Sequence, residues 1–392
     1  MMCRMRLQAP LLLLGLALQA TSAEAQQTVT DVIGFLVTNQ AVPTADFERD
    51  QAAAEAARDT ISRALLVNLT SVPLATSSSG FLYRFNPELG TVERATETFG
   101  AFFVERALTA GRGRASFGVT AMTTGFDELD GRNLRDGTLV TVANRFRDEA
   151  EPFDTESLTL RLRTSTMTLF GSVGVTNRLE VGAALPLVSL RLEGQRVNVY
   201  RGATFLQASG TATASGIADL ALRAKYAIVT GPRGGVAAAF EARLPTGDEE
   251  SLLGAGATSY RVMAIGSFEE GPLGLHGNLA LVRGGIADEI DFAGGAAFAV
   301  HPRVTLSGEL IARYVPDLHE IELAAAPHPT IAGVDTLRLM AGTSGSTLAN
   351  AVAGVKWNVG GAVVIGGHLM WPFNKRGLTA PMTPTLALEY AF

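Results

Sequence analysis

Histidine, serine and carboxylate side chains are the groups in this chain that would carry catalysis or bind a metal ion. The five histidines are His276, His301, His319, His328 and His368. His319 and His328 share one segment with Glu320 and Glu322, but their spacing fits no compact metal motif. The sequence has no glycine-rich phosphate loop, cysteine pair or nucleophile elbow. We therefore expect no catalytic residue, no cofactor and no metal ligand, and a protein that is not an enzyme.

The remaining charged residues follow a pattern that is typical of β-strands. From about residue 78 onward, apolar and polar residues alternate with a period of two. In residues 219–228, leucine, alanine, tyrosine and isoleucine fill the even positions, whereas Arg223 and Lys225 fall on the opposite face. The pattern predicts fourteen strands, near residues 78–86, 96–108, 113–124, 156–174, 178–192, 214–229, 234–245, 257–269, 272–284, 290–300, 303–315, 346–358, 361–372 and 383–392.

The composition indicates that these strands lie in a membrane. The mean hydropathy is +0.22, with 47% apolar residues, 18% charged residues and 42 glycines among 392 residues. Beyond the N-terminus, no run reaches the roughly 18 apolar residues that a membrane-spanning helix requires. The net charge of −6 gives no basic excess that would indicate nucleic-acid binding.

Short and long connections alternate along the predicted strands. The short ones fall near residues 109–112, 175–177, 230–233, 270–271, 301–302 and 359–360, and the long ones at 125–155, 193–213, 246–256, 316–345 and 373–382. A soluble Greek-key sandwich would not sort its connections in this way, whereas outer-membrane barrels have short periplasmic turns and long extracellular loops. Because a strand in lipid must pair all its backbone groups, the sheet has to close. The predicted fold is all-β, a transmembrane antiparallel up-and-down β-barrel of about 14 strands, with 12 as the fallback.

Charged residues of this barrel are expected to line its lumen. The lumen-lining candidates are Arg161, Arg163, Asp219, Arg223, Lys225, Glu241, Arg243, Arg261, His276, Glu309, Arg313 and His368. One interpretation is a cross-strand network, in which Arg223 faces Glu241 and holds neighbouring strands in register. The other is a polar path that favours anionic or electron-rich solutes. Both interpretations stay open at the level of the sequence.

The N-terminus has the features of a secretory signal. Arg4 and Arg6 precede an apolar stretch over residues 10–18, and residues 23–25 give a small-x-small cleavage pattern. We expect residues 1–25 to be a signal peptide that is cleaved after Ala25 and directs the chain to the bacterial outer membrane. Residues 26–77 are expected to form a short helical segment, either a plug or a periplasmic extension, and residues 78–392 the barrel.

The C-terminus resembles the closing strand that outer-membrane proteins present to the barrel-assembly machinery. Leu386, Leu388, Tyr390 and Phe392 share one face of the last predicted strand, and the chain ends on the aromatic residue. Trp357 and Trp371 lie at opposite ends of adjacent predicted strands, where aromatic girdles belong. These residues predict an insertion signal and a bilayer partner.

Several turn and strand-end motifs carry a resemblance to a known family. They are residues 174–182 (GVTNRLEVG) with the following Leu185-Pro186, residues 215–220 (SGIADL) with Lys225-Tyr226, residues 243–248 (RLPTGD) and residues 253–256 (LGAG). Over about residues 96–392 the chain resembles the outer-membrane β-barrel family of transporters of the meta-pathway of phenol degradation, which is architecturally like the long-chain fatty-acid transporters. Ala218 stands where this pattern has glycine, and the helical segment lies outside it.

The resemblance implies a channel or transporter for passive uptake of small hydrophobic or aromatic compounds. We expect a monomer whose partners are the lipid bilayer, the barrel-assembly machinery and small hydrophobic solutes, with no nucleic acid. The alternative is an outer-membrane lipid-acting enzyme or a structural barrel without transport activity.

Overall fold

A computed structural model gives the fold of the chain and describes residues 27–37, 55, 58–67, 83–86, 91–94 and 96–391. The expected signal peptide with its cleavage site at Ala25 lies outside the described residues. So do Phe392 and most of the connection between the two N-terminal helices. In the described part of the chain, neither helix is long and apolar enough to cross a membrane.

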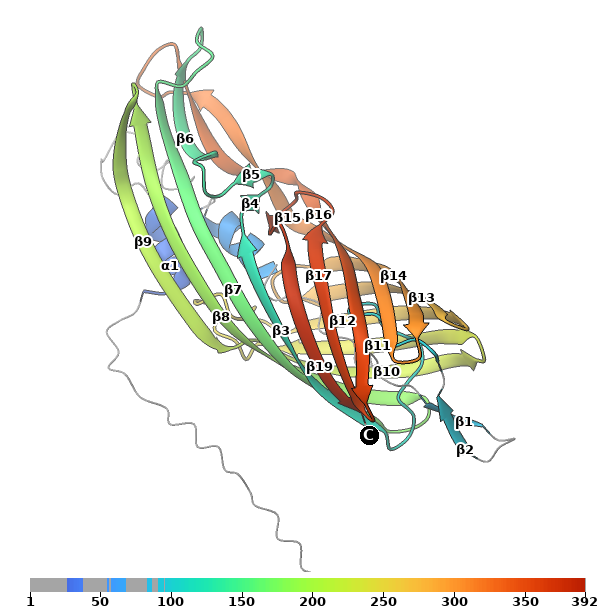
Figure 1. The fold of residues 1–392 in the computed structure, drawn as a ribbon. Coiled ribbons are helices and arrows are strands. Elements are labelled where there is room, and N and C mark those ends of the chain that lie inside the picture. Colours follow the sequence, from blue (N-terminus) through green and yellow to red (C-terminus); the bar gives the residue numbers. More distant parts are fainter. Residues whose placement is uncertain are drawn as a thin grey trace, which may run out of the picture.

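Twelve antiparallel strands close into a barrel (Figure 1). They are β3 (Ala115–Phe126), β7 (Asp154–Gly174), β8 (Leu179–Tyr200), β10 (Leu220–Gly231), β11 (Gly234–Leu244), β12 (Ser259–Glu270), β13 (Leu273–Gly284), β14 (Glu289–His301), β15 (Val304–Pro327), β16 (Val334–Gly360), β17 (Val363–Pro372) and β19 (Thr383–Ala391). Each pairs with the next, and β19 pairs with β3 to complete the ring. The all-β barrel is therefore confirmed, with the fallback number of 12 strands in place of 14.

The barrel wall has apolar side chains outside and polar side chains inside. Val262 of β12 and Leu281 of β13 are 58% and 54% exposed, whereas Lys225 of β10 and Glu241 of β11 are 1% and 2% exposed. A soluble β-protein would bury the first pair and expose the second. The inverted distribution is that of a membrane-spanning barrel whose outer surface faces acyl chains.

Two of the fourteen expected strands are absent from this ring. The first falls on the short hairpin of β1 (Tyr83–Asn86) and β2 (Thr91–Arg94), which lies beside the barrel end that carries the C-terminus (Figure 1). The second, expected at residues 96–108, is not a strand. The short turns lie at this same end, which is the periplasmic end by the usual layout of such barrels.

A half-shell rises from the opposite, outer end of the barrel. The outer parts of β7, β8, β15 and β16 extend beyond the short strands, together with β6 (Leu139–Phe146) and β9 (Ala203–Ile217). β6 pairs with both β7 and β16, and β9 pairs with β8. The expected long loops at residues 193–213 and 316–345 are therefore largely strand extensions of this shell. A three-stranded sheet of β4 (Glu128–Leu129), β5 (Arg132–Asn133) and β18 (Leu378–Thr379) lies on the outer connections.

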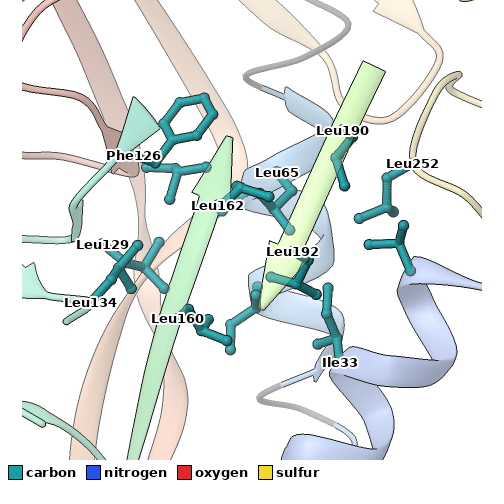
Figure 2. Packing of buried hydrophobic residues seen from close by; sticks show 14 of the residues in the cluster. Ile33, Leu65, Phe126, Leu129, Leu134, Leu160, Leu162, Leu190, Leu192 and Leu252 are labelled. Carbon is teal, nitrogen blue, oxygen red and sulfur yellow. The ribbon is translucent and has the colours of Figure 1, made fainter. Parts of the chain in front are cut away.

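An apolar core fills the inside of the half-shell (Figure 2). Helix α1 (Val29–Val37) packs on β8 and β9, and the helical residues 58–67 contribute to the same cluster. The helix approaches the wall closely at Gly194, where an added Cβ atom would lie 2.3 Å from Cδ1 of Leu36. The inner face of the shell is thus a packed interior of leucine side chains, among them Leu160 and Leu192.

This core reverses the expected placement of Arg161 and Arg163. Both arginines are exposed on the outward face of β7, while Leu158, Leu160 and Leu162 point inward. The assumption that outward residues are apolar applies only where lipid contacts the wall. In the half-shell the outer face meets water and the inner face packs against helices, so the polarity of the two faces is exchanged.

Candidate functional site

Residues 96–110, here called the inner segment, run through the barrel interior. They form no strand, yet most of them are buried, including Phe99 at 0% and Glu105 at 1% exposure. A buried backbone without a strand partner must satisfy its polar groups elsewhere. In this protein the side chains of the inward-facing wall residues supply those partners.

Glu309 of β15 makes the densest of these contacts. Its carboxylate accepts hydrogen bonds from three successive backbone N–H groups, those of Phe102 and Phe103 at 2.7 Å and of Val104 at 2.9 Å. The residue is 4% exposed. Hydrogen bonds to an ionised acceptor are about twice as strong as neutral ones. This carboxylate therefore fixes the middle of the inner segment to the wall.

Further backbone contacts reach strands around the whole ring. Asn278 of β13 both accepts from the Glu105 N–H at 2.7 Å and donates to its carbonyl at 3.0 Å. The remaining contacts involve Thr305 with Phe99, Ser267 with Ala107, Glu180 with Ala110, Lys356 with Ala101 and Lys225 with Arg106. These wall residues belong to β8, β10, β12, β13, β15 and β16. The inner segment therefore lies across the lumen and contacts opposite sides of it.

Phe102 occupies a recess in the wall formed by two glycines. A Cβ atom added at Gly354 would lie 2.4 Å from the Phe102 ring, and one at Gly366 would lie 2.8 Å from it. The His368 ring packs on Phe102 with centroids 4.4 Å apart. The Lys356 ammonium lies 4.5 Å from the ring centroid, within range of a cation–π interaction. The absence of side chains at the two glycines is what allows this close approach.

An ion-pair network joins the inner segment to β10 and β11. Arg223 contacts the carboxylates of both Glu105 and Glu241, and Arg243 contacts Glu241 at 3.0 Å. Arg223 and Glu241 are directly opposite in the strand register, as the sequence predicts. The Lys225 ammonium lies 3.4 Å from the carboxylate of Glu105 and 3.6 Å from that of Glu180. Lumenal charges therefore pair with the inner segment as well as with each other.

Ten of the twelve lumen-lining candidates are buried or half-buried in the wall: Asp219, Arg223, Lys225, Glu241, Arg243, Arg261, His276, Glu309, Arg313 and His368. Arg261 pairs with Asp291 at 2.7 Å, Arg313 lies 3.9 Å from Glu289, and His276 lies 3.7 Å from Glu269. Asp219 instead holds the outer loop at residues 246–256, because it accepts from the N–H groups of Gly247 and Ala255. Arg161 and Arg163 are the two exceptions described above.

The inner segment itself is the part of the site that the sequence interpretation missed. Residues 96–108 have the length and hydropathy of a strand. The signal against a strand is the loss of alternation, since three apolar residues at 102–104 are followed directly by Glu105 and Arg106. Both charged residues are 1% exposed. In a half-buried strand, neighbouring side chains point to opposite faces, so one of the two would be exposed.

A cavity of about 70 Å³ lies inside the outer half of the barrel wall. Thr124, Thr164 and Arg313 give it polar groups, and Phe126 and Ile311 give it apolar ones. Strands β3, β7, β15, β16 and β17 and the connection at residues 373–382 line it. Its lining places hydroxyl groups beside apolar side chains, but its volume is below the roughly 150 Å³ of a cavity that holds benzene, so an aromatic molecule would enter it only if the lining moved apart.

The connection at residues 373–382 is fastened to the outer end of the barrel. Lys375 donates to Glu128 at 2.7 Å, and this hydrogen bond raises the pKa of the Lys375 ammonium. The backbone N–H of Gly377 donates to Asp130 at 2.7 Å. Asn374 donates to the carbonyl of Thr347 at 2.7 Å. These contacts hold the connection over the cavity.

Among the described residues, no group of three or more histidine, cysteine or carboxylate side chains is placed to hold a metal ion. His368 lies 5% exposed inside the barrel against Phe102 and Phe103. It is therefore not on the lipid-facing surface, where a lipid-acting enzyme would need its base.

The closed barrel, its apolar outer surface and its polar interior define the class of outer-membrane β-barrels, the architecture of outer-membrane channels and transporters. Residues 137–307 match the model of the family described as "Putative MetA-pathway of phenol degradation". This match runs from β6 into β15 and confirms the family resemblance carried by the sequence motifs. No curated protein sequence matches the chain.

Solved structures that resemble the chain are outer-membrane barrels. The outer membrane channel from Pseudomonas putida F1 has a TM-score of 0.44 and 14% identity, over 73% of this chain and 98% of that one. The translocator domain of the autotransporter NalP from Neisseria meningitidis has a TM-score of 0.37 and 12% identity, over 72% and 89%. The toluene transporter TbuX of Ralstonia pickettii has a TM-score of 0.29 and 11% identity, over 73% and 91%.

Proposed function

We propose that this chain is an outer-membrane transporter for passive uptake of small hydrophobic or aromatic compounds, and that the inner segment closes its lumen until a solute passes. The observation that carries the proposal is the attachment of the inner segment through wall side chains. A strand in a sheet would be held by a continuous ladder of backbone bonds. Side-chain contacts such as Glu309 with Phe102 are released without opening the barrel wall.

The side chains inside the barrel indicate which class of solute the protein would transport. Buried ion pairs such as Arg223 with Glu105 join the wall to the inner segment inside the lumen, which disfavours a wide water-filled pore for ions and sugars. The cavity at the outer half offers apolar walls beside the Thr124 and Thr164 hydroxyl groups. A phenol-like molecule has the matching distribution of one hydroxyl group and an apolar ring. The family match, whose description names phenol degradation, supports the same class of solute.

The helices of the half-shell are a second barrier in this proposal. Val32 and Leu36 of α1 pack against β9 and β8 at Gly210 and Gly194. We place the solute entrance at the outer end of the barrel, next to these helices. The protein is further proposed to act as a monomer that reaches the membrane by the signal peptide and the barrel-assembly machinery, with Leu386, Leu388 and Tyr390 on the outward face of β19 as the described part of the insertion signal.

Uptake by proteoliposomes tests the proposed function. The purified protein is reconstituted, and entry of phenol and toluene is compared with entry of arabinose and of potassium ions. The proposal expects faster entry of the two aromatic compounds than in protein-free vesicles, with little change for arabinose. Equal acceleration of all solutes would indicate a general pore. No acceleration of any solute would indicate a structural barrel.

A further inference from the structure

Two arginines lie side by side on the outward face of the barrel at the base of the half-shell. Arg163 of β7 is directly opposite Arg191 of β8, and Arg191 is opposite Thr213 of β9. All three side chains are exposed. Like charges directly opposite in a sheet are destabilising unless an anion lies between them. Arg191 has one partner, Glu193 at 2.7 Å, and no carboxylate in the described chain pairs with Arg163.

The rows below this pair change from hydroxyl groups to apolar groups. On the same outward face, the next row holds three serines and the row after it three apolar side chains: Ser165, Ser189, Ser215, Met167, Leu187 and Ile217. All three adjacent strands therefore change in the same way. Their outward side chains are basic or hydroxyl-bearing in the first row, hydroxyl-bearing in the second and apolar in the third. This order is that of a membrane interface, from headgroup to acyl chain.

The height of the arginine row agrees with such an interface. Val173, near the periplasmic turn, and Arg163 are both outward residues of β7 and are separated by ten positions. At a rise of about 3.3 Å per residue they are about 33 Å apart along the strand. A strand tilt of about 35–45° converts this to about 23–27 Å along the membrane normal, and the apolar band of outer-membrane barrels is about 25 Å tall. Arg163 thus lies at the outer boundary of the apolar band.

A groove of about 1110 Å³ begins directly below the arginines on the same surface. Its lining includes the two lower rows on β7, β8 and β9 and continues to exposed leucines of other strands, among them Leu369 and Leu386. The groove is therefore apolar over most of its length and has hydroxyl groups and then arginines at one rim. A molecule that matches it has a long apolar body and an anionic end.

We propose that this surface binds a phosphate-bearing lipid of the outer leaflet, with a phosphate group between Arg163 and Arg191 and acyl chains along the groove. Guanidinium groups bind phosphate through paired, charge-assisted hydrogen bonds. Thr213 lies beside Arg191 in the same row and adds a hydroxyl group near the headgroup. A free phosphate ion would meet the arginines but leave the groove unused, which is why we assign the site to a lipid. The proposal does not depend on the transport function.

Native mass spectrometry of the full-length protein in detergent tests this site. The probes are bisphosphorylated lipid A, the same lipid after removal of its phosphates, and inorganic phosphate. The test variant is R163Q/R191Q. The matched control is R233Q/R303Q, which removes the same charge from two exposed arginines on periplasmic turns. Because all four side chains are exposed, the folded barrel is expected to persist, and its thermal transition checks this.

The wild type and the control are expected to bind lipid A at least tenfold more tightly than the dephosphorylated lipid. R163Q/R191Q is expected to lose this preference while still binding both lipids through the groove. Two results would overturn the assignment: a variant that keeps the preference for the phosphorylated lipid, or a wild type from which millimolar inorganic phosphate displaces lipid A. The second result would identify a simple anion site in place of a lipid site.

Discussion

Glu309 accepts a hydrogen bond from the backbone N–H of Phe102 at 2.7 Å, although the two residues are 207 positions apart in the chain. The same carboxylate accepts from the next two N–H groups. One wall residue thereby holds three successive residues of a segment that has no strand partner. This contact joins the wall to the inner segment more directly than any ion pair in the lumen, because its three donors are backbone groups.

Replacement of Glu309 by alanine is expected to open the lumen. The substitution leaves two buried N–H groups and the half-buried one of Phe103 without acceptors, and the loss at a buried group costs about 1–3 kcal/mol. The inner segment is then expected to leave its position, and single-channel conductance in planar bilayers should rise severalfold. Glu309→Gln, which keeps one acceptor oxygen, should give an intermediate conductance. Glu270→Gln, on an exposed periplasmic turn, is the control and should behave as wild type. An unaltered current in Glu309→Ala would argue against a sealing role for this contact.

Gly354→Ala is expected to displace Phe102 from its recess. The added methyl group would lie 2.4 Å from the ring, so the ring must move, and overpacking of this kind typically costs about 1–3 kcal/mol. The double variant G354A/F102A removes the contact with the ring, and leaves those with Cβ of His368 at 2.7 Å and the Gly367 carbonyl at 2.9 Å. It should therefore be more stable than the sum of the two single changes predicts, but less stable than wild type. Thermal unfolding in detergent of the wild type, G354A, F102A and G354A/F102A measures the four stabilities. Gly266→Ala, where no atom lies within 4 Å of the new methyl group, is the control. Strict additivity would show that Phe102 does not occupy the recess.

Arg223→Met is expected to destabilise the barrel interior. Glu105 and Glu241 each have a 2% exposed side chain and would lose a charged partner. Removal of one partner from a buried ion pair lowers the free energy of unfolding by about 3–5 kcal/mol. Glu241 keeps Arg243 at 3.0 Å, whereas Glu105 keeps the longer contact with Lys225 at 3.4 Å, so the cost should fall mainly on Glu105. Arg223→Met combined with Glu105→Gln should therefore recover part of the lost stability in urea unfolding. A double variant no more stable than Arg223→Met would mean that these charges are not coupled.

Gly194→Ala is expected to push α1 away from the wall of the half-shell. Its methyl group would lie 2.3 Å from Cδ1 of Leu36. The substitution should expose the α1 region to protease while leaving the membrane-embedded barrel intact. The double variant G194A/L36A should regain most of the protection, because only the contact with Cδ2 of Leu160 at 2.9 Å is left. Limited proteolysis followed by N-terminal sequencing distinguishes these outcomes. Equal protection in Gly194→Ala and wild type would mean that the helix does not pack against the half-shell at this position in the membrane-inserted protein.

The sequence predicted the ring of strands well because lipid imposes a simple rule on each of them. All twelve strands of the ring correspond to expected segments, and the pairing of Arg223 with Glu241 follows from the position of one turn. Alternation specifies the two faces of a strand, and turn position specifies its register. Both are local properties that a single sequence carries.

The parts that the sequence did not predict depend on contacts between distant residues. Residues 96–108 resemble a strand in length and hydropathy, and their real partners are side chains such as Glu309 and Asn278 on remote strands. Alternation placed Arg161 and Arg163 correctly on the face opposite to the leucines of β7. It did not reveal that an apolar cluster including the helical residues would cover those leucines and leave the arginines outside. Alternation gives the division into faces but not the surroundings of each face.

The most direct test of the central claim is to fasten the inner segment to the wall. An added Cβ atom at Gly295 would lie 3.2 Å from Cγ2 of Val104 and 3.0 Å from Cγ of Glu309. The side chains at positions 104 and 295 therefore meet, and a cysteine pair there is expected to form a disulfide, which requires Cβ atoms about 3.8 Å apart. The chain's one other cysteine, Cys3, lies in the expected signal peptide. In proteoliposomes, reduced V104C/G295C should accelerate phenol entry relative to protein-free vesicles, and oxidised V104C/G295C should not. Equal phenol entry in the oxidised and reduced protein would contradict closure of the lumen by the inner segment.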